Sequence, residues 1–238
     1  MATVTETETA APPVPWETAE ELLEALGGIA LSRVRMRPLP GTATEADLIA
    51  VNERKSGICE LIDGVLVEKT MGAYESYLAV LLSHLLMSFV RPRNLGVVLG
   101  ADGMLKLFPG MIRIPDVSFL AWDRVPPGTI TRRVAAPAVA PDLAVEVISL
   151  SNTKKEMAQK LLDYFAAGTR LVWYFDPGPR IVTVFRSPEQ STTLHEDQTL
   201  DGGDVLPGFA LPLRGFFDEP DLEGGEPRGG ANGAGQGG

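Results

Sequence analysis

Residues 141–177 read PDLAVEVISLSNTKKEMAQKLLDYFAAGTRLVWYFDP, and this stretch decides the fold because it holds a strand, a helix and a second strand in one short unit. Residues 143–148 are apolar toward both faces of the expected strand, which is typical of a strand covered on both sides. A helix is predicted from Thr153, which fits a capping box with Glu156. Residues 170–176 then resume as a strand, and the crossover between the two strands should be right-handed.

Glu146 is the first functional clue in this unit, because it lies on a strand face that is otherwise apolar except for Asp142. Burying a carboxylate is costly unless its charge is compensated, so Glu146 should be paired, protonated or bound to a cation. Lys160 lies at the margin of the apolar stripe of the following helix. Its long aliphatic stem could cross apolar surface and carry the ammonium group back toward the sheet.

The length of 238 residues and an apolar content of 45% suit one sizeable core and therefore a single domain. This domain is expected over residues 16–219, between a leader at 1–15 and a Gly-rich tail at 220–238 that both have the composition of disordered segments. No uninterrupted apolar run approaches the roughly 18 residues of a membrane helix, and the leader carries acids where a secretory signal would carry bases. The sequence therefore predicts a soluble, cytoplasmic protein without membrane contact.

Composition excludes several kinds of site. The lone Cys59 cannot form an internal disulfide or a zinc cluster, and only two histidines exist, so chemistry that needs several histidines is excluded. A net charge of -10 argues against a broad electrostatic grip on nucleic acid, since Lys and Arg contacts to phosphate dominate such binding. Action on DNA would depend on local basic clusters such as Lys154 with Lys155, which are more simply interpreted as solvated surface.

The rest of the chain predicts helices around a sheet. Two strands flank Asp63-Gly64, the strongest short signal for a β-hairpin. A capping box of Thr42 with Glu45 should begin a short helix. Residues 74–90 should form a helix that is apolar around most of its circumference, which implies burial against the sheet and a contact within a homodimer.

Further strands are expected in the middle of the chain, where they should form a meander, at residues 97–100, 104–108 and 112–121. The Pro-, Arg- and Thr-rich segment 123–140 is long for a compact domain, so it is either a functional flap or a flexible loop. Together these patterns predict an α/β (α+β) fold with a mixed, mostly antiparallel sheet flanked by helices.

Two carboxylates carry the candidate chemistry. Asp116 lies in the mostly apolar strand IRIPDVSFLAW, and Glu146 lies in a neighbouring strand. Together they would offer oxygen ligands to Mg²⁺, which favours one or two carboxylates with phosphate oxygens. The metal would polarise a phosphate and lower the pKa of a bound water, Lys160 would stabilise the developing charge, and the reaction would be phosphodiester hydrolysis. Alternatively, Asp116 caps a strand entry, Glu146 and Lys160 form a buried ion pair, and no reaction follows.

Five segments, taken in order, carry a resemblance to a known family: ELIDGVLVEKTMG, IRIPDVSFLAW, PDLAVEVISLSN, QKLLDYFAAGTRLVWYFDP and LPGFALPL. Over about residues 40–217 the sequence resembles the Uma family of restriction-endonuclease-like proteins, a bacterial group assigned to the PD-(D/E)XK nuclease superfamily. The resemblance implies a restriction-endonuclease-like core. It also implies a Mg²⁺-dependent endonuclease that hydrolyses phosphodiester bonds of DNA, with Mn²⁺ as a substitute metal.

The resemblance also implies roles for particular residues. Asp116 would be the motif aspartate and Glu146 the motif acid, and both would bind the metal. In the plain superfamily motif a lysine stands at position 148, where this chain has Ile148. Family members supply the amine from the following helix, which maps onto Lys160, there to orient or activate the attacking water. Many superfamily members use a further acid on an early helix, for which Glu75 is the candidate.

Two alternatives stay open from the sequence. The protein is either an active nuclease or a catalytically weak or inactive module that keeps the fold for binding or assembly. The acidic charge and the isoleucine at position 148 favour the second alternative, whereas three polar residues in apolar settings favour the first. Glu60, in the first hairpin, is another candidate acid, but a surface position is expected for it.

Overall fold

The computed structural model describes residues 16–54 and 57–218. The leader at 1–15 and the tail at 220–238, for which the sequence predicts disorder, lie outside the described residues. The described helices are α1 (Ala19–Ala25), α2 (Glu45–Glu53), α3 (Ala73–Val90) and α4 (Lys154–Ala166), with short 3-10 turns η1 (Leu31–Arg33) and η2 (Arg91–Arg93). The described strands are β1 (Cys59–Ile62), β2 (Val65–Glu68), β3 (Gly96–Leu99), β4 (Leu105–Phe108), β5 (Met111–Arg113), β6 (Val117–Ala121), β7 (Leu143–Val147), β8 (Leu171–Asp176), β9 (Ile181–Ser187), β10 (Gln190–His195), β11 (Thr199–Asp201) and β12 (Ala210–Pro212).

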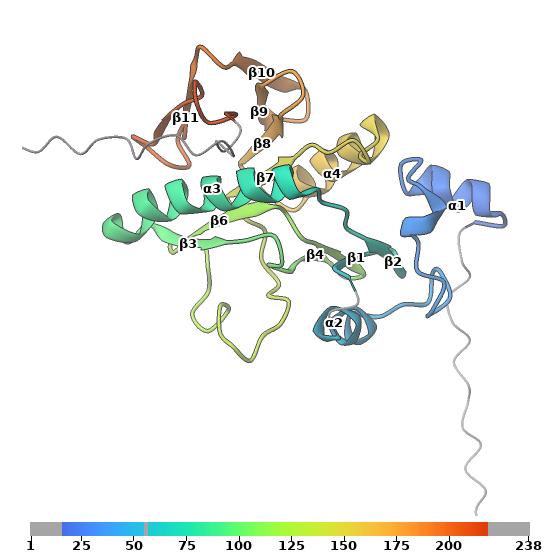
Figure 1. The fold of residues 1–238 in the computed structure, drawn as a ribbon. Coiled ribbons are helices and arrows are strands. Elements are labelled where there is room, and N and C mark those ends of the chain that lie inside the picture. Colours follow the sequence, from blue (N-terminus) through green and yellow to red (C-terminus); the bar gives the residue numbers. More distant parts are fainter. Residues whose placement is uncertain (1–15, 55–56, 219–238) are drawn as a thin grey trace, which may run out of the picture.

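The described strands are divided between two main sheets and a small third one (Figure 1). One main sheet has four strands in the order β2-β1-β5-β4, and the other has six in the order β10-β9-β8-β7-β6-β3. In the six-stranded sheet β7 and β8 run parallel, and the other neighbouring strands are antiparallel. The predicted mixed, mostly antiparallel architecture is therefore confirmed, although it is split between two sheets.

The central strand-helix-strand unit forms as the sequence predicts, as β7, α4 and β8. α4 begins after Thr153, whose hydroxyl accepts a hydrogen bond from the Glu156 N–H at 3.0 Å. The carboxylate of Glu156 does not complete the predicted capping box, because it pairs with Arg33 at 2.7 Å instead. The parallel register places Glu146 of β7 beside Tyr174 of β8. Both side chains therefore point to the same face of the sheet.

Helices cover both faces of the six-stranded sheet. Val145 and Val147 of β7 pack in the main core with Leu78 of α3, which lies along the sheet in Figure 1. Ala144 lies on the opposite face and packs with Met157 of α4. β7 is therefore buried from both sides, as its continuous apolar sequence predicts. Glu146 shares the α4 face with Ala144 because strand side chains alternate.

The middle strands do not form the predicted meander. β3 pairs with β6 in the six-stranded sheet, whereas β4 and β5 form a hairpin in the four-stranded sheet. The single strand expected at residues 112–121 is divided into β5 and β6 at Ile114-Pro115-Asp116. Proline suits this division because it has no N–H to donate to a strand ladder. The chain passes from one sheet to the other here, so Asp116 lies at the junction of the two sheets.

The predicted hairpin turn and the predicted helix cap both exist, but the helix cap lies two residues later than expected. The β1–β2 hairpin turns at Asp63 and Gly64, which have φ values of 47° and 77°, so an Asp-Gly pair suits it. The capping box that begins α2 is formed by Thr44 with Asp47, two residues later than predicted. Both boxes satisfy the same rule, and the structure selects the second.

α3 combines a buried face with an exposed one. By length and composition it is the one helix in the described part of the chain that is apolar enough to cross a membrane. A core helix of a soluble protein has the same character, and Leu78, Leu82 and Leu86 pack against the six-stranded sheet. The other face exposes Val80 and Met87, at 67% and 47% of their surface. Core packing therefore accounts for only part of the apolar surface of α3.

The segment between β6 and β7 is the long loop that the sequence predicts (Figure 1). It is attached to the domain at several points. Ala136 is buried in the core of the four-stranded sheet, and Arg124 pairs with Asp142 at 2.7 Å. Asp142 also accepts the Ala121 N–H at 2.7 Å, so this acid holds the loop to the base of β7.

Candidate active site

Asp116 and Glu146 lie side by side where the two main sheets meet. The Asp116 N–H donates to the carbonyl oxygen of Val145 at 2.9 Å, and its Oδ2 accepts the Val147 N–H at 2.7 Å. Asp116 therefore forms hydrogen bonds to the backbone of both residues that flank Glu146. Only 3% and 4% of the two acids are exposed. The neighbouring-strand arrangement expected from the sequence is thus present.

Lys160 reaches these acids from α4. Its Nζ lies 3.1 Å from both carboxylate oxygens of Glu146 and 3.5 Å from Oε1 of Glu60. The Tyr164 hydroxyl, one helical turn further along, donates to Glu146 Oε1 at 2.5 Å. An amine carried on the helix can therefore meet the acid on the strand, because α4 packs directly over β7.

Glu60 is not the surface residue that the sequence suggests. It is 2% exposed, and its carboxylate pairs with Arg113 at 2.9 Å and accepts the Ile114 N–H at 2.9 Å. The expectation was wrong because β1 is covered on both faces. The signal was available: Glu60 stands between Cys59 and Leu61, in a strand as apolar as the one that carries Glu146.

Arg113 connects Glu60 to a further buried acid, Asp163. Its guanidinium group contacts Glu60 on one side and Asp163 of α4 on the other, and both acids are buried. The order of charges is then Glu146, Lys160, Glu60, Arg113 and Asp163, with signs that alternate. Such alternation lets a group of buried charges compensate one another. It also ties the four-stranded sheet to α4.

Lys69 is the site residue that sequence reasoning missed. It directly follows β2, and its side chain is 8% exposed, with Nζ 2.8 Å from Asp116 Oδ1. A lysine at the end of a short strand is ordinarily interpreted as solvated. The available signal was its place in ELIDGVLVEKTMG, one of the segments that carry the family resemblance.

The electrostatics of the cluster fix the protonation of Lys160. Burial alone would lower the pKa of Lys160, but Glu146 and Glu60 raise it above its ordinary value. Burial also opposes ionisation of Glu60, yet Lys160 and Arg113 lower its pKa to about 2. Lys160 is therefore an ammonium group and Glu60 a carboxylate at neutral pH. Lys160 can donate hydrogen bonds and stabilise negative charge, but it cannot act as a base.

The lowered pKa of Glu60 leads to a prediction about acid stability. The ordinary carboxyl value is 4.5 and the folded value is about 2, so this group stabilises the fold above pH 4.5 and loses that contribution as pH falls toward 2. The full contribution is on the order of 3 kcal/mol. We expect the difference in free energy of unfolding between wild type and Glu60→Gln to shrink between pH 6 and pH 3.5, as measured by urea denaturation. A difference that stays constant over this range would contradict the paired carboxylate.

The carboxylate oxygens of Asp116 and Glu146 are of the type that binds hard divalent cations such as Mg²⁺. Asp116 Oδ1 is buried and receives no hydrogen bond within the described residues, although the Lys69 ammonium faces it. An oxygen with unused lone pairs beside a second carboxylate is what Mg²⁺ takes, with water and substrate oxygens completing its shell. The described residues contain no group of three His, Cys, Asp or Glu side chains arranged around one ion. A metal held by Asp116 and Glu146 would therefore need further ligands of another kind, such as backbone carbonyl oxygens, water or substrate oxygens.

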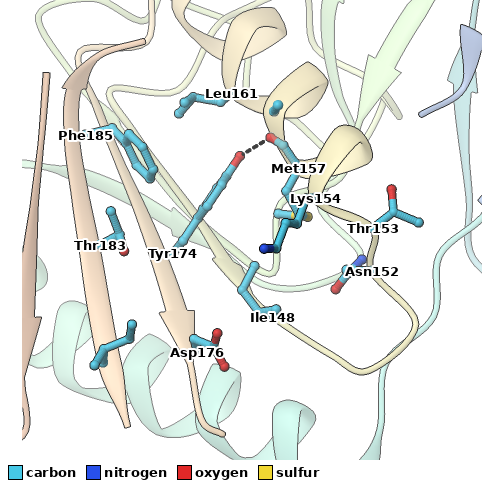
Figure 2. A pocket seen from close by; sticks show the side chains of 12 residues that line it. Ile148, Asn152, Thr153, Lys154, Met157, Leu161, Tyr174, Asp176, Thr183 and Phe185 are labelled. Atoms are coloured by element: carbon cyan, nitrogen blue, oxygen red, sulfur yellow. Dashed lines mark hydrogen bonds between the residues drawn. The ribbon is translucent and has the colours of Figure 1, made fainter. Parts of the chain in front are cut away.

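Ile148 belongs to a different surface. It lines an apolar groove of about 360 Å³ between α4 and strands β8 and β9, together with Met157, Tyr174 and Phe185 (Figure 2). The Tyr174 hydroxyl donates to the Met157 carbonyl oxygen at 2.7 Å, so this side chain reaches from β8 to α4 across the groove (Figure 2). A side chain at position 148 therefore forms part of an apolar wall. The amine near Glu146 comes instead from Lys160.

Glu75 is not joined to the cluster. It lies in the first turn of α3 and lines a separate hollow of about 480 Å³ with Ile148, Ser149 and Asp176. Among the contacts of the described residues, none links Glu75 to Asp116 or Glu146. Its predicted role as a further acid stays a prediction.

Comparisons with known proteins agree with the fold. Residues 43–214 match the model of the Uma2 family, which is described as a putative restriction endonuclease. Among solved structures, the chain is similar to a crystal structure of a putative nuclease belonging to DUF820 from Anabaena variabilis ATCC 29413. The identity is 20%, the TM-score is 0.60, and the match covers 67% of this chain and 89% of that chain, so this likeness shows the fold alone. None of the curated proteins matches the chain.

Proposed function

Because this chain belongs to the Uma2 family of putative restriction endonucleases, we propose that it is a metal-dependent endonuclease that hydrolyses phosphodiester bonds of DNA. The observation that carries the proposal is the meeting of Asp116, Glu146 and Lys160. Asp116 directly precedes β6, Glu146 lies in β7 and Lys160 lies in α4. Asp116 Oδ2 nevertheless accepts the N–H of Val147, next to Glu146, and the Lys160 ammonium group lies 3.1 Å from both oxygens of Glu146. A charged constellation of this kind inside a core is typical of functional sites, although structural networks also form it.

The chain would supply two kinds of group to the reaction. Asp116 and Glu146 would hold Mg²⁺, or Mn²⁺ in its place, and the bound metal would polarise the phosphate and lower the pKa of a water. Lys160 would hold positive charge where negative charge develops on the phosphate oxygens. Because Lys160 stays protonated, it would orient the attacking water by hydrogen bonding rather than remove its proton. In the reaction the water oxygen would form a bond to phosphorus and release a proton to solvent, while the bond between phosphorus and the ester oxygen breaks and the leaving oxygen takes a proton from solvent.

Glu60 would act through Lys160 rather than on substrate. It lies 3.5 Å from the Lys160 Nζ and is itself fixed by Arg113. With Glu146 on the other side, the ammonium group is held between two carboxylates. Glu60 is therefore proposed as a positioning residue, and Glu75, in its separate hollow, stays a candidate acid.

The test of this function is a cleavage assay with the purified full chain. Single-stranded, duplex and branched DNA are incubated with Mn²⁺, beside Glu146→Gln and a matched surface control, Glu196→Gln. Glu196 pairs with Arg180 and is about half exposed. We expect cleavage by wild type and by the control, loss of cleavage with Glu146→Gln, and loss in excess chelator. Equal cleavage by Glu146→Gln, or no cleavage of any substrate, would contradict the proposal.

A non-catalytic binding or assembly module is the second candidate function. The observation that favours it is the closure of the cluster, since Asp116, Glu146 and Lys160 are each at most 4% exposed and their charges are already paired. Thermal unfolding separates the two candidates, because a ligand that binds only the folded state raises its stability. An endonuclease site should gain stability from Mn²⁺, and Asp116→Asn should lose that gain. A module without a metal site should show no gain in either protein.

A homodimer is proposed as the functional assembly. The outward face of α3 exposes Tyr77, Val80 and Met87, and exposed apolar side chains on one helix are a candidate contact surface. Light scattering on the purified chain tests this proposal, and Val80→Asp should convert a dimer to a monomer. A wild-type monomer at high protein concentration would refute it.

A further inference from the structure

The ammonium group of Lys69 lies among three oxygen atoms. Its Nζ donates to the carbonyl oxygens of Ile114 and Ala101 at 2.7 and 3.3 Å, and it lies 2.8 Å from Asp116 Oδ1. One carboxylate oxygen and two backbone carbonyl oxygens thus surround one positive charge. These are also the oxygen types that hard divalent cations take in proteins.

The contact of Lys69 with Asp116 is a buried ion pair. Asp116 Oδ1 accepts no hydrogen bond in the described part of the chain, while Oδ2 accepts the Val147 N–H at 2.7 Å. Lys69 therefore compensates the charge of the buried Asp116 carboxylate. The two carbonyl oxygens receive its directed hydrogen bonds.

A cavity of about 260 Å³ lies beside this position. Its lining includes Asp116 and Ala101, two of the three residues whose oxygen atoms surround the Lys69 ammonium group. The same lining includes Val80 and Met87, which are exposed residues of α3. The cavity therefore borders the Lys69 position on the side of α3.

We infer that Lys69 is a tethered cation that occupies a three-oxygen cation site at Asp116 and competes there with the divalent metal. This inference rests on the proposed function, because it assumes that Asp116 is a metal ligand. When the metal is absent, Lys69 keeps the buried carboxylate compensated and the junction of the two sheets intact. The ammonium group has to leave the three oxygens before an ion can use them, so it lowers the affinity of the site for metal.

Replacing Lys69 should change the affinity for metal in opposite directions according to its role. If Lys69 assisted metal binding, loss of its charge would weaken binding. If it competes, Lys69→Met should bind metal more tightly and should be less stable than wild type without metal. The thermal stabilisation produced by Mn²⁺ should then be larger in the variant than in wild type, because the ion replaces the missing charge.

The experiment measures the affinity for Mn²⁺ by electron paramagnetic resonance and the metal-dependent shift in unfolding temperature. Wild type, Lys69→Met, Lys69→Arg and the matched control Lys106→Met are compared as full chains. Lys106 pairs with Glu45 at 2.7 Å on a partly exposed surface. We expect Lys69→Met to bind Mn²⁺ at least about tenfold more tightly, in the range of ordinary coupling between two ligands. Lys69→Arg keeps the charge and should bind no more tightly than wild type, as should the control.

Each remaining outcome decides the inference. An affinity of Lys69→Met equal to or weaker than that of wild type would overturn it, while a wild type that binds Mn²⁺ and cleaves DNA would leave the proposed function standing. If neither protein binds Mn²⁺, both proposals fail. If Lys69→Met does not fold alone, millimolar Mn²⁺ should restore its circular dichroism spectrum, and failure to restore it would count against the inference.

Discussion

Replacing Lys160 by methionine should lower the rate of Mn²⁺-dependent DNA cleavage about 100- to 1000-fold, which is the usual loss when one preorganised charge-stabilising group is removed. The ammonium group is buried and held between Glu146 and Glu60, so no other cation of α4 can replace it at this position. Initial rates at saturating DNA measure the effect. The loss should appear in kcat, because Lys160 would stabilise negative charge that develops only during the reaction.

The matched control is Lys106→Met, which removes the same charge from a partly exposed ion pair with Glu45. It should retain the wild-type rate. Rates must be corrected for the folded fraction, because Lys160→Met also leaves two buried carboxylates with less compensation. A corrected rate within a factor of about three of wild type would contradict a direct role for Lys160.

Replacing Arg113 by methionine should cost about 3–5 kcal/mol of the free energy of unfolding, because it leaves buried charges without a partner. Arg113 contacts Glu60 and Asp163, and all three side chains are at most 6% exposed. These acids raise its pKa further above the ordinary arginine value, although burial opposes this, so Arg113 is always charged. A loss of this size is a large fraction of the stability of an ordinary domain.

Urea denaturation at pH 7 measures this loss, with Arg186→Met as the control. Arg186 lies 3.9 Å from Asp201 at a side-chain exposure of 42%, and such surface pairs contribute at most about 1 kcal/mol. Similar losses for the two variants would show that the buried charges between the sheets and α4 do not stabilise the fold as described.

The sequence predicted the central unit because its signals are local. Thr153 marks the start of α4, and the apolar run before it marks a strand covered on both sides. Glu146 and Lys160 are 14 residues apart in one strand-helix unit, so their meeting required only that the helix pack over its own strand. Asp116 was predicted from its place in the mostly apolar segment IRIPDVSFLAW, and the family resemblance implied the same residue.

The other half of the cluster could not be predicted in this way because it comes from the second sheet. Arg113 and Glu60 are 53 residues apart, and nothing in either segment indicates that they lie opposite each other. The sequence was interpreted as one sheet, so Glu60 was placed on an outer surface. Splitting the strand at Pro115 would have revealed the second sheet, since proline interrupts a ladder.

The position of Lys69 illustrates a further limit. A side chain at the end of β2 is ordinarily solvated. The crossing of the chain at Ile114 brings the Asp116 carboxylate and one carbonyl oxygen to Lys69, and the connection between β3 and β4 brings the carbonyl oxygen of Ala101. The first residue of α2 was also uncertain from the sequence. Thr42 and Thr44 each precede an acid by three residues, and tertiary packing selected the second.

A crystal of the full chain grown with Mn²⁺ tests the central claim most directly, through the anomalous difference signal of the metal. We expect one strong peak in contact with the carboxylates of both Asp116 and Glu146, with the Lys160 ammonium group still beside Glu146. Manganese bound only elsewhere on the molecule, or no peak at these two acids at millimolar Mn²⁺, would contradict a metal-dependent hydrolytic site at the junction of the two sheets.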